Sequence, residues 1–552
     1  MELTKTDWID DILTKLKWLE DIRKPWEAEW QEIADYVHPK RANFDWDKDR
    51  FGERIGTKIY DSMAQDSNQL RAEGLQGYVT SAASAWFRLG FEDEDITKLP
   101  GAKAWIEEVE KKFYSIFRRS NFYEAIFNMF LDYGAFGTAV MYIELDPKTG
   151  KVVFSTRHLK EIYIEEDKHQ RADTIYRRSY MSARDLIKTF GEDKFEEGWL
   201  ERAESRPFEQ HLVLHATFPR EDRDFYKIDQ LNKPVASIYI LEKGKILLRE
   251  GGYDDNPYIV LRDGKNPDEV YGLGVSHSAL PEILQSQEIT RDTMRARQKA
   301  VDPAVTYPAE LMGTLDLDPG GENPLSPGAG EVKAINQSQF YPAGTEQQEQ
   351  IWKRIRDKYN VDFWLMLTQM IGQNITATQV MEMSAEKAAV LGTLLGLIND
   401  QLLDPLFDRV FSIAYKAGMF PVPPESLIST QAEIKVDYIG PLAQKQKQFH
   451  AVFGLNQALQ QYAPLTELAP ETKDVLDWDE AAIHILESGG APAKTVRDRK
   501  TIKKIRDGRA KAQQEVLQMQ QGQHLADLYN KTQKAPEEGS GAEAIEGALS
   551  GQ

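Results

Sequence analysis

The chain has 552 residues, of which 41% are hydrophobic and 28% are charged, and it contains no cysteine. This length exceeds one ordinary core, so two to four domains or one elongated subunit of several parts are expected, while the missing thiols exclude disulfides and thiolate metal sites. The formal net charge of −20 excludes a protein that grips nucleic acid over its whole surface, because phosphate binding needs clustered Lys and Arg, so any DNA contact must be local or weak.

A helical stripe opens the chain. Apolar residues step by three or four from Trp8 to Ile33, as in a helix that faces a core, and Pro25 is expected to kink or split it. The region 44–91 predicts one helix, a turn and a strand, and residues 102–119 predict another helix. Alternating strand patterns follow to about residue 262, so the middle third is α+β in character.

A compact insert then lies between two predicted helices. Residues 277–301 contain no Gly and one early Pro, which favours a helix. Residues 302–344 hold six Pro and six Gly, a density that favours short strands and turns. In the second helix, Thr345 and Gln348 have capping-box spacing, and one face is apolar at steps of four: Ile351, Ile355, Tyr359, Phe363 and Leu367.

The longest predicted helix begins at Thr376 and continues to Gly418. At 1.5 Å per residue it spans about 60 Å. Pro405 interrupts it, so a kink is expected near residues 401–405. A strand over residues 432–440 and further helices come next, and from about residue 535 the composition is that of a disordered tail.

Six segments in this order resemble the head-to-tail connectors, or portal proteins, of short-tailed (podovirus-type) bacteriophages. The order and coverage, roughly residues 30 to 515, carry the resemblance, because no single segment is diagnostic. The segments are WQEIADYVHPKR followed by YDSMA, LQGYVTSAASAWFRL, FGTAVMYIE, YGLGVSHSALPEILQSQEITRDT, NITATQV, and YIGPLAQKQK followed by LDWDEAAIHILESGGAPAKTVRDRKTIKKIRDGRAKAQQ.

The resemblance implies an α+β, mainly helical portal fold with a wing, a two-helix stem, a β-rich clip and a helical crown. Its implied parts are the wing at 1–276, stem helix 1 at 277–301, the clip at 302–345, stem helix 2 at 346–366, a tunnel loop at 367–375, the rest of the wing with a long kinked helix and a strand at 376–445, the crown at 446–530 and a disordered tail at 531–552.

The resemblance also implies a function without catalysis. Copies of the chain would form a ring, typically a dodecamer, at one capsid vertex of the virion after assembly in the host cytoplasm. The ring would be the channel for double-stranded DNA, without sequence specificity, in packaging and ejection. It would dock the terminase large subunit and then the tail adaptor and tail tube, and would contact the major capsid and scaffolding proteins. No cofactor, metal or membrane is implied.

A row of cations on the first stem helix is the candidate lining of the DNA channel. Arg291, Arg295 and Lys299 share one face, with Arg297 to the side. In a ring they would form circles of positive charge that attract phosphates weakly and read no bases. The alternative is a solvated face whose arginines pair with Glu288, Asp292 or a neighbouring subunit.

Two further groups are candidate contacts. Gln369, Gln373 and Asn374 are neutral amides in the implied tunnel loop, and ordinary turn and capping chemistry is their alternative. In the crown, residues 494–511 hold nine basic and two acidic side chains, and six acidic groups just upstream could pair with them. The residues of this crown basic patch are Lys500, Lys503, Lys504 and Arg506.

Two functions of other classes stay open. One is an ATP-driven nucleic-acid translocase, but GGAPAKT lacks the Gly before Lys that a phosphate-cradling loop requires. The other is a cytoplasmic scaffold protein with long helices and no channel.

Overall fold

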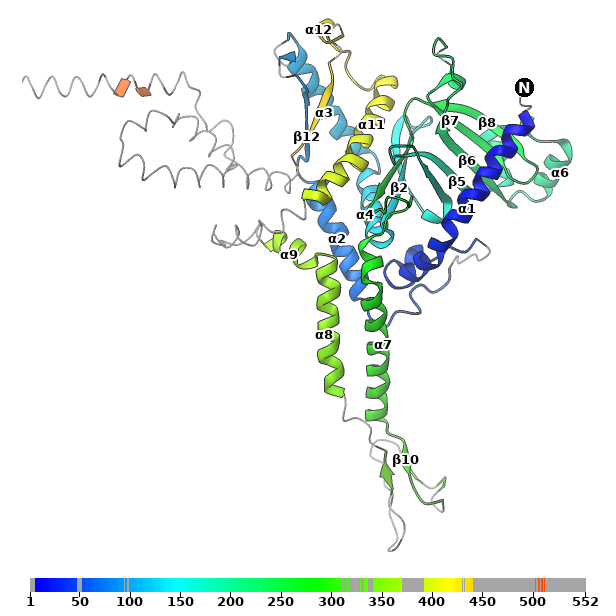
Figure 1. Cartoon of the computed structure of the whole chain (residues 1–552), viewed down its shortest axis with the longest axis vertical. Helices are drawn as coiled ribbons and strands as arrows, with labels where there is room; N and C mark the ends of the chain where they lie inside the picture. Colours follow the sequence, from blue (N-terminus) through cyan, green and yellow to red (C-terminus); the bar gives the residue numbers. More distant parts are fainter. Residues whose placement is uncertain are drawn as a thin grey trace, which may run out of the picture. The chain divides into compact units, whose positions relative to one another are not determined.

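The computed structural model describes residues 5–46, 52–93, 95–96, 99–227, 229–309, 341–369, 392–428, 430 and 432–439, with short pieces between 312 and 335 and between 502 and 511. The chain forms two compact units, Met1–Lys445 and Gln446–Gln552. Figure 1 labels the helices and strands of the first unit. No helix within these described residues is long and apolar enough to cross a membrane.

One uninterrupted helix, α1 (Lys5–Tyr36), contains Pro25, which therefore does not split it. The predicted apolar stripe holds at Leu16 and Trp30, both buried, but Ile22 is exposed. The adjacent Arg23 takes its place and is 1% exposed. Its guanidinium donates to the carbonyl of Ile162 over 2.7 Å and to that of Leu159 over 3.0 Å, as a buried charge requires.

The helix, turn and strand predicted over residues 44–91 are confirmed as α2 (Met63–Val79) and β1 (Phe87–Phe91), and the helix over 102–119 is α3 (Ala102–Arg119). The next helix, α4 (Phe122–Phe136), leads directly into the strands. These helices enclose the largest core of the unit, which is rich in aromatic rings: Trp86, Phe87, Phe113, Phe117, Phe122 and Phe407.

Two antiparallel sheets form the middle third, which confirms its α+β character. The smaller has the order β3-β2-β9, and the larger is a five-stranded meander from β4 to β8, against which α1 packs (Figure 1). The strands are β2 (Thr138–Asp146), β3 (Lys151–Arg157), β4 (Ile162–Glu166), β5 (Ala172–Ser182), β6 (Gln210–Pro219), β7 (Val235–Leu241), β8 (Ile246–Tyr253) and β9 (Tyr258–Arg262). Between β5 and β6 lie α5 (Ala183–Phe190) and α6 (Glu197–Ser205).

The helix predicted over 277–301 is present as α7 (Val275–Val301), and α8 (Tyr341–Lys358) runs beside it (Figure 1). Between them, β10 (Val305–Thr306) pairs with β11 (Lys333–Ala334). The predicted cap at Thr345 is wrong, because α8 already begins at Tyr341, with a proline in its first turn, where the missing N–H costs nothing.

The second predicted helix is broken. After α8, Asn360 has a φ of 55°, a left-handed conformation that Asn tolerates better than most residues, and α9 (Val361–Gln369) begins after it. The apolar face survives the break, since Ile355, Tyr359 and Phe363 are all buried. A spacing of four residues therefore predicted the buried positions but not the interruption.

The last part of the first unit confirms an interruption beside Pro405. Residues 392–398 are helical, η8 (Asn399–Leu403) is a π-helical turn, and α11 (Asp404–Lys416) continues from it. The predicted start at Thr376 lies outside the described residues. Beyond α12 (Glu425–Ile428), the predicted strand over 432–440 is β12 (Ile434–Tyr438), which pairs with β1.

Candidate functional site

Glycines join the N-terminal end of α7 to the turn between α4 and β2. The backbone N–H of Asp263 donates to the Gly137 carbonyl over 2.7 Å, and a Cβ at Gly274 would lie 2.4 Å from the Gly137 nitrogen. Gly137 has a φ of 67°, a conformation that favours glycine. Two segments that carry the resemblance, FGTAVMYIE and YGLGVSHSALPEILQSQEITRDT, therefore meet backbone to backbone.

A buried hydroxyl pair holds α7 against the break between α8 and α9. Ser276 Oγ donates to the Gly134 carbonyl over 2.7 Å, so the Tyr359 hydroxyl, which is also 2.7 Å away, donates to Ser276. Both side chains are fully buried, where an unpaired hydroxyl costs about 1–3 kcal/mol. Burial raises the pKa of the Tyr359 phenol, so it keeps the proton that this bond needs.

The carboxylate of Asp61 links α7 to α8. Its Oδ2 accepts bonds from the Ser286 hydroxyl, from Trp352 Nε1 at 2.8 Å and from Gln348 Nε2 at 3.3 Å. The Gln287 amide also donates to the Asp61 carbonyl over 2.7 Å and accepts from its N–H over 3.0 Å. Because Asp61 belongs to the segment YDSMA before α2, it ties both long helices to the body of the unit.

The four predicted channel-lining residues lie in the C-terminal half of α7: Arg291, Arg295, Arg297 and Lys299. Arg291 donates to Glu288 over 2.7 Å and lies 3.6 Å from the Asp292 carboxylate, and Arg295 lies 3.9 Å from that same carboxylate. The pairing that was the alternative interpretation is thus present within one chain. These carboxylates weaken the attraction of the row for phosphates, and its place in a channel stays a prediction.

The other predicted residues lie at the edge of the described part of the chain or outside it. Gln369 ends α9, so residues 367–369, assigned above to the tunnel loop, continue a helix. Arg506 is in a helical segment and exposed. The remaining five lie outside the described residues: Gln373, Asn374, Lys500, Lys503 and Lys504.

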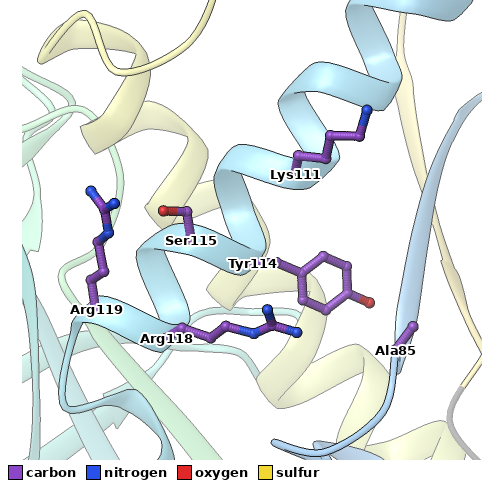
Figure 2. A pocket seen from close by; sticks show the side chains of 6 residues that line it. All are labelled: Ala85, Lys111, Tyr114, Ser115, Arg118 and Arg119. Carbon is purple, nitrogen blue, oxygen red and sulfur yellow. The ribbon is translucent and has the colours of Figure 1, made fainter.

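A groove of about 490 Å³ follows α3 beside the segment that precedes β1 (Figure 2). Figure 2 shows Tyr114 and Arg118 extending to one side of the helix, toward Ala85, and Ser115 and Arg119 to the other. We call this surface the α3 groove. Its lining residues are Ala85, Lys111, Tyr114, Ser115, Arg118 and Arg119.

The floor of the α3 groove is fixed by Tyr114. Its hydroxyl donates to the Phe87 carbonyl over 2.7 Å and accepts from the N–H groups of Trp86 and Phe87, each at 3.1 Å. Burial, opposed by these backbone bonds, raises the pKa of the Tyr114 phenol. The Arg118 guanidinium lies 6.0 Å from the ring centroid, within reach of a cation–π attraction.

The three cations of the α3 groove have no carboxylate partner among the residues that the structure describes. No ion pair joins Lys111, Arg118 or Arg119 to any of these residues. The carboxylate of Glu110, next to Lys111 in sequence, instead accepts the Leu89 N–H over 2.9 Å. The sequence analysis missed this surface, although i, i+7 spacing already placed Lys111 and Arg118 on one face of a predicted helix, with Arg119 beside them.

A buried charge cluster in the first unit consists of Arg41, Asp132 and His38. Arg41 donates to both oxygens of Asp132 over 3.0 and 2.9 Å, and His38 lies 3.3 Å from one of them. Burial raises the pKa of this carboxyl, but the charge of Arg41 and the His38 bond outweigh it and hold the pKa of Asp132 below its usual value. We assign the cluster a structural role, because the Asp132 carboxylate is satisfied by Arg41 and His38. His38 also lines a cavity of about 450 Å³ beside Pro39 and Leu131.

The neighbouring His158 is kept neutral. Its Nδ1 accepts from the Lys160 N–H over 3.0 Å, so Nε2 carries the proton and donates to the Arg41 carbonyl over 2.9 Å. Burial, and then the charge of Arg41, lower the pKa of His158 to about 4. Within the described residues, no group of three or more His, Asp or Glu side chains could hold a metal ion.

Comparisons with known proteins cover nearly all of the chain. The model of one family, described as bacteriophage head to tail connecting protein, matches residues 10–496. A portal protein of Salmonella phage epsilon15 is 28% identical over 527 residues, which cover 93% of this chain and 93% of that protein. A probable portal protein of Bordetella phage BPP-1 is 27% identical over 515 residues, which cover 92% of each chain. None of these descriptions names an enzymatic activity.

Proposed function

This chain belongs to the family of bacteriophage head-to-tail connecting proteins, and on that premise we propose that it is a portal protein. Copies of the chain form a ring at one capsid vertex of the virion. The central channel of the ring passes double-stranded DNA inward during packaging and outward during ejection.

The observation that carries this proposal is the anchored pair of long helices. Both α7 and α8 are fixed to the body of the unit at several points, through Gly274, Ser276 and Asp61. A closed ring requires each subunit to present two different complementary faces to its neighbours. Anchored helices suit that requirement, because every copy of the chain then presents the faces of α7 and α8 to its neighbours at the same angle.

The parts of the subunit follow from this proposal. The wing comprises residues 1–276 and 376–445. The stem helices comprise residues 277–301, within α7, and 346–366, and the clip comprises residues 302–345 between them. The clip docks the terminase large subunit during packaging and the tail adaptor and tail tube afterwards. The wing faces the major capsid and scaffolding proteins, and the tunnel loop and crown complete the channel.

The paired arginines of α7 suit a channel that must let DNA slide. A free cation attracts phosphate, whereas Arg291 and Arg295 share the carboxylates of Glu288 and Asp292. In a ring their attraction is weak and sensitive to salt, as nonspecific contacts are. In an infection assay, replacing Arg291 and Arg295 by Ala changes the packaging yield and its salt response if this face lines the channel. An unchanged yield would remove these two residues from the channel.

The ring itself is tested with the purified full-length chain. Negative-stain images with rotational averaging should give annular particles with a central hole, and native mass spectrometry should give a closed oligomer, with twelve copies expected. A stable compact monomer at high concentration, with no annular species, contradicts the proposal. Particles without a hole, or ATP hydrolysis, would favour the scaffold or the translocase instead.

A further inference from the structure

We infer that the α3 groove binds the phosphate backbone of double-stranded DNA, at a site on the wing that is separate from the channel face of α7. This inference rests on the proposed function, since a portal meets DNA at close range. The groove provides a local contact of the kind that a chain with a net charge of −20 permits.

Unpaired charge is the first argument. Lys111, Arg118 and Arg119 are all exposed, and no described carboxylate forms an ion pair with them. Glu107 stands one turn before Lys111, where it could pair, yet the structure has no bond between them. Arg118 and Arg119 lie beyond the reach of Glu107, so the C-terminal half of this face carries net positive charge.

Rigid presentation is the second argument. The opposite face of α3 is fixed in the aromatic core through Phe113 and Phe117, which are 2% and 0% exposed. Lys111 and Arg118 are two turns apart along one ridge, about 10 Å by the helical rise. The cations therefore project from a helix whose opposite face is packed in the core, and binding needs to order only their side chains.

The chemistry of the lining favours phosphate over an acidic polypeptide. A docked peptide must satisfy its own backbone N–H and C=O groups, but the Tyr114 hydroxyl is already used by Trp86 and Phe87. Ser115 provides the remaining hydroxyl. The other polar groups of the groove are the N–H donors of Lys111, Arg118 and Arg119, which cannot accept a hydrogen bond. Phosphate oxygens only accept, so these donors match the DNA backbone, whose contacts carry no sequence information.

Cations in the last turn of a helix also stabilise it through the helix dipole. That role affects folding alone, so measurement of DNA binding separates it from the inferred site.

The test uses the full-length chain and a fluorescently labelled 30-base-pair duplex, with anisotropy measured at several salt concentrations. The variant K111Q/R118Q/R119Q should bind at least about tenfold more weakly at low salt, and the slope of log K against log salt should fall by about two to three, one for each lost phosphate contact. Circular dichroism checks that the variant is folded. Arg119→Gln alone, at a residue for which the described part of the chain shows no contact with an aromatic ring, should weaken binding about threefold.

The matched control is R184Q/K188Q/R202Q, which removes three exposed cations from α5 and α6 and should change affinity less than twofold. Equal losses in both triple variants would mean that only net charge matters and would overturn the inference. Unchanged binding in the groove variant would overturn it as well. If polyglutamate displaces the duplex as effectively per charge as unlabelled DNA, the occupant is an acidic polypeptide and the DNA assignment is wrong.

Ring formation is measured on the same samples. A ring whose DNA affinity is indifferent to the three substitutions refutes the α3 site and leaves the portal proposal standing. A chain that forms no ring refutes the portal proposal, whatever its affinity for DNA.

Discussion

The exposed half of α7 and the α3 groove both present cations on a helix, but they differ in the acidic residues nearest to those cations. On α7, Glu288 and Asp292 lie within 3.9 Å of Arg291 or Arg295. On α3, the carboxylate next in sequence to the cations is bonded to a strand backbone. Whether a cation is available to bind an anion thus depends on the acidic residues about one helical turn away. A count of Lys and Arg does not show this.

The largest effect is expected where Gly274, at the N-terminal end of α7, contacts the backbone of Gly137. Gly274→Ala brings a Cβ within 2.4 Å of the Gly137 nitrogen. The nearest atoms belong to the backbone of Gly137 and Tyr133, which cannot move away as a flexible side chain could. We expect a loss of about 4 kcal/mol or more in the free energy of unfolding. Denaturant unfolding of the full chain, followed by circular dichroism, measures this loss.

Gly77→Ala is the matched control, since a Cβ there meets nothing within 4 Å. This residue lies inside α2, so the change should be neutral or should stabilise the protein by up to about 1 kcal/mol. Equal stability of the two variants would show that the backbone around Gly137 and Gly274 moves to accommodate the added methyl group.

The second test removes the Asp61 carboxylate, which bonds to Ser286 of α7 and to Gln348 and Trp352 of α8. Asp61→Ala leaves the Trp352 indole N–H, the Ser286 hydroxyl and one Gln348 proton without their acceptor. We expect a loss of about 3 kcal/mol, because each buried orphan costs about 1–3 kcal/mol and some will find water. Chemical denaturation measures it. Asp66→Ala, an exposed carboxylate on α2, should cost less than about 1 kcal/mol; an equal loss would mean that Asp61 is not a buried link.

The third test concerns His158, which its surroundings keep uncharged. The folded pKa of His158 is about 4, below the ordinary value of about 6.5, so the unfolded chain takes up the proton first. Stability should be unaffected above pH 6.5, should fall as the pH drops from 6.5 to about 4, and should then level off, with a total contribution of about 3 kcal/mol.

Other histidines, including the partly buried His277, also have lowered pKa values. The effect of His158 is therefore measured as the difference between the parent protein and a variant without this side chain. Urea unfolding is followed from pH 7 to pH 4 in the parent protein and in His158→Gln. The parent should lose more stability over that range. Parallel curves would show that His158 is protonated equally in both states.

A weaker effect is expected when the acids beside the α7 arginines are neutralised. If paired acids are what distinguish α7 from α3, E288Q/D292N should make the α7 row more like the α3 groove. We expect about two- to fivefold tighter binding of duplex DNA at low salt, and a salt slope steeper by up to about one. The control E346Q/E349Q removes the same net charge from α8. An equal gain in that control would attribute the effect to net charge alone.

Much of the fold could be predicted from local pattern. The helix over 102–119 and the strand β12 follow from periodicity, because each buries one face against a core. The start of α8 could not be predicted from Thr345, because a capping-box spacing competes with a proline-tolerant first turn a few residues earlier. The break at Asn360 was also missed, because the apolar residues keep their spacing of four across it. Asn360 itself, a residue that tolerates the left-handed conformation, was the one local signal.

The candidate sites divide in the same way. The i, i+4 spacing of Arg291 and Arg295 predicted a shared face and named Glu288 and Asp292 as possible partners. The α3 groove needs Ala85 and the backbone of β1 beside Tyr114, residues about 30 positions earlier in the chain, and no local pattern reports that proximity. The Asp61 link is similar, because its partners lie more than two hundred residues away.

The π-helical turn at Asn399–Leu403 has a consequence for how this chain tolerates changes of length. Such a turn holds one residue more than an α-helical turn, and here Gln401 uses it to accept the Arg262 N–H over 2.9 Å. Deleting one residue from it would restore regular winding and rotate residues 392–398 by about 100° relative to α11. A single-codon deletion at this point would therefore change the direction in which the side chains of residues 392–398 point, while leaving the packing of α11 intact.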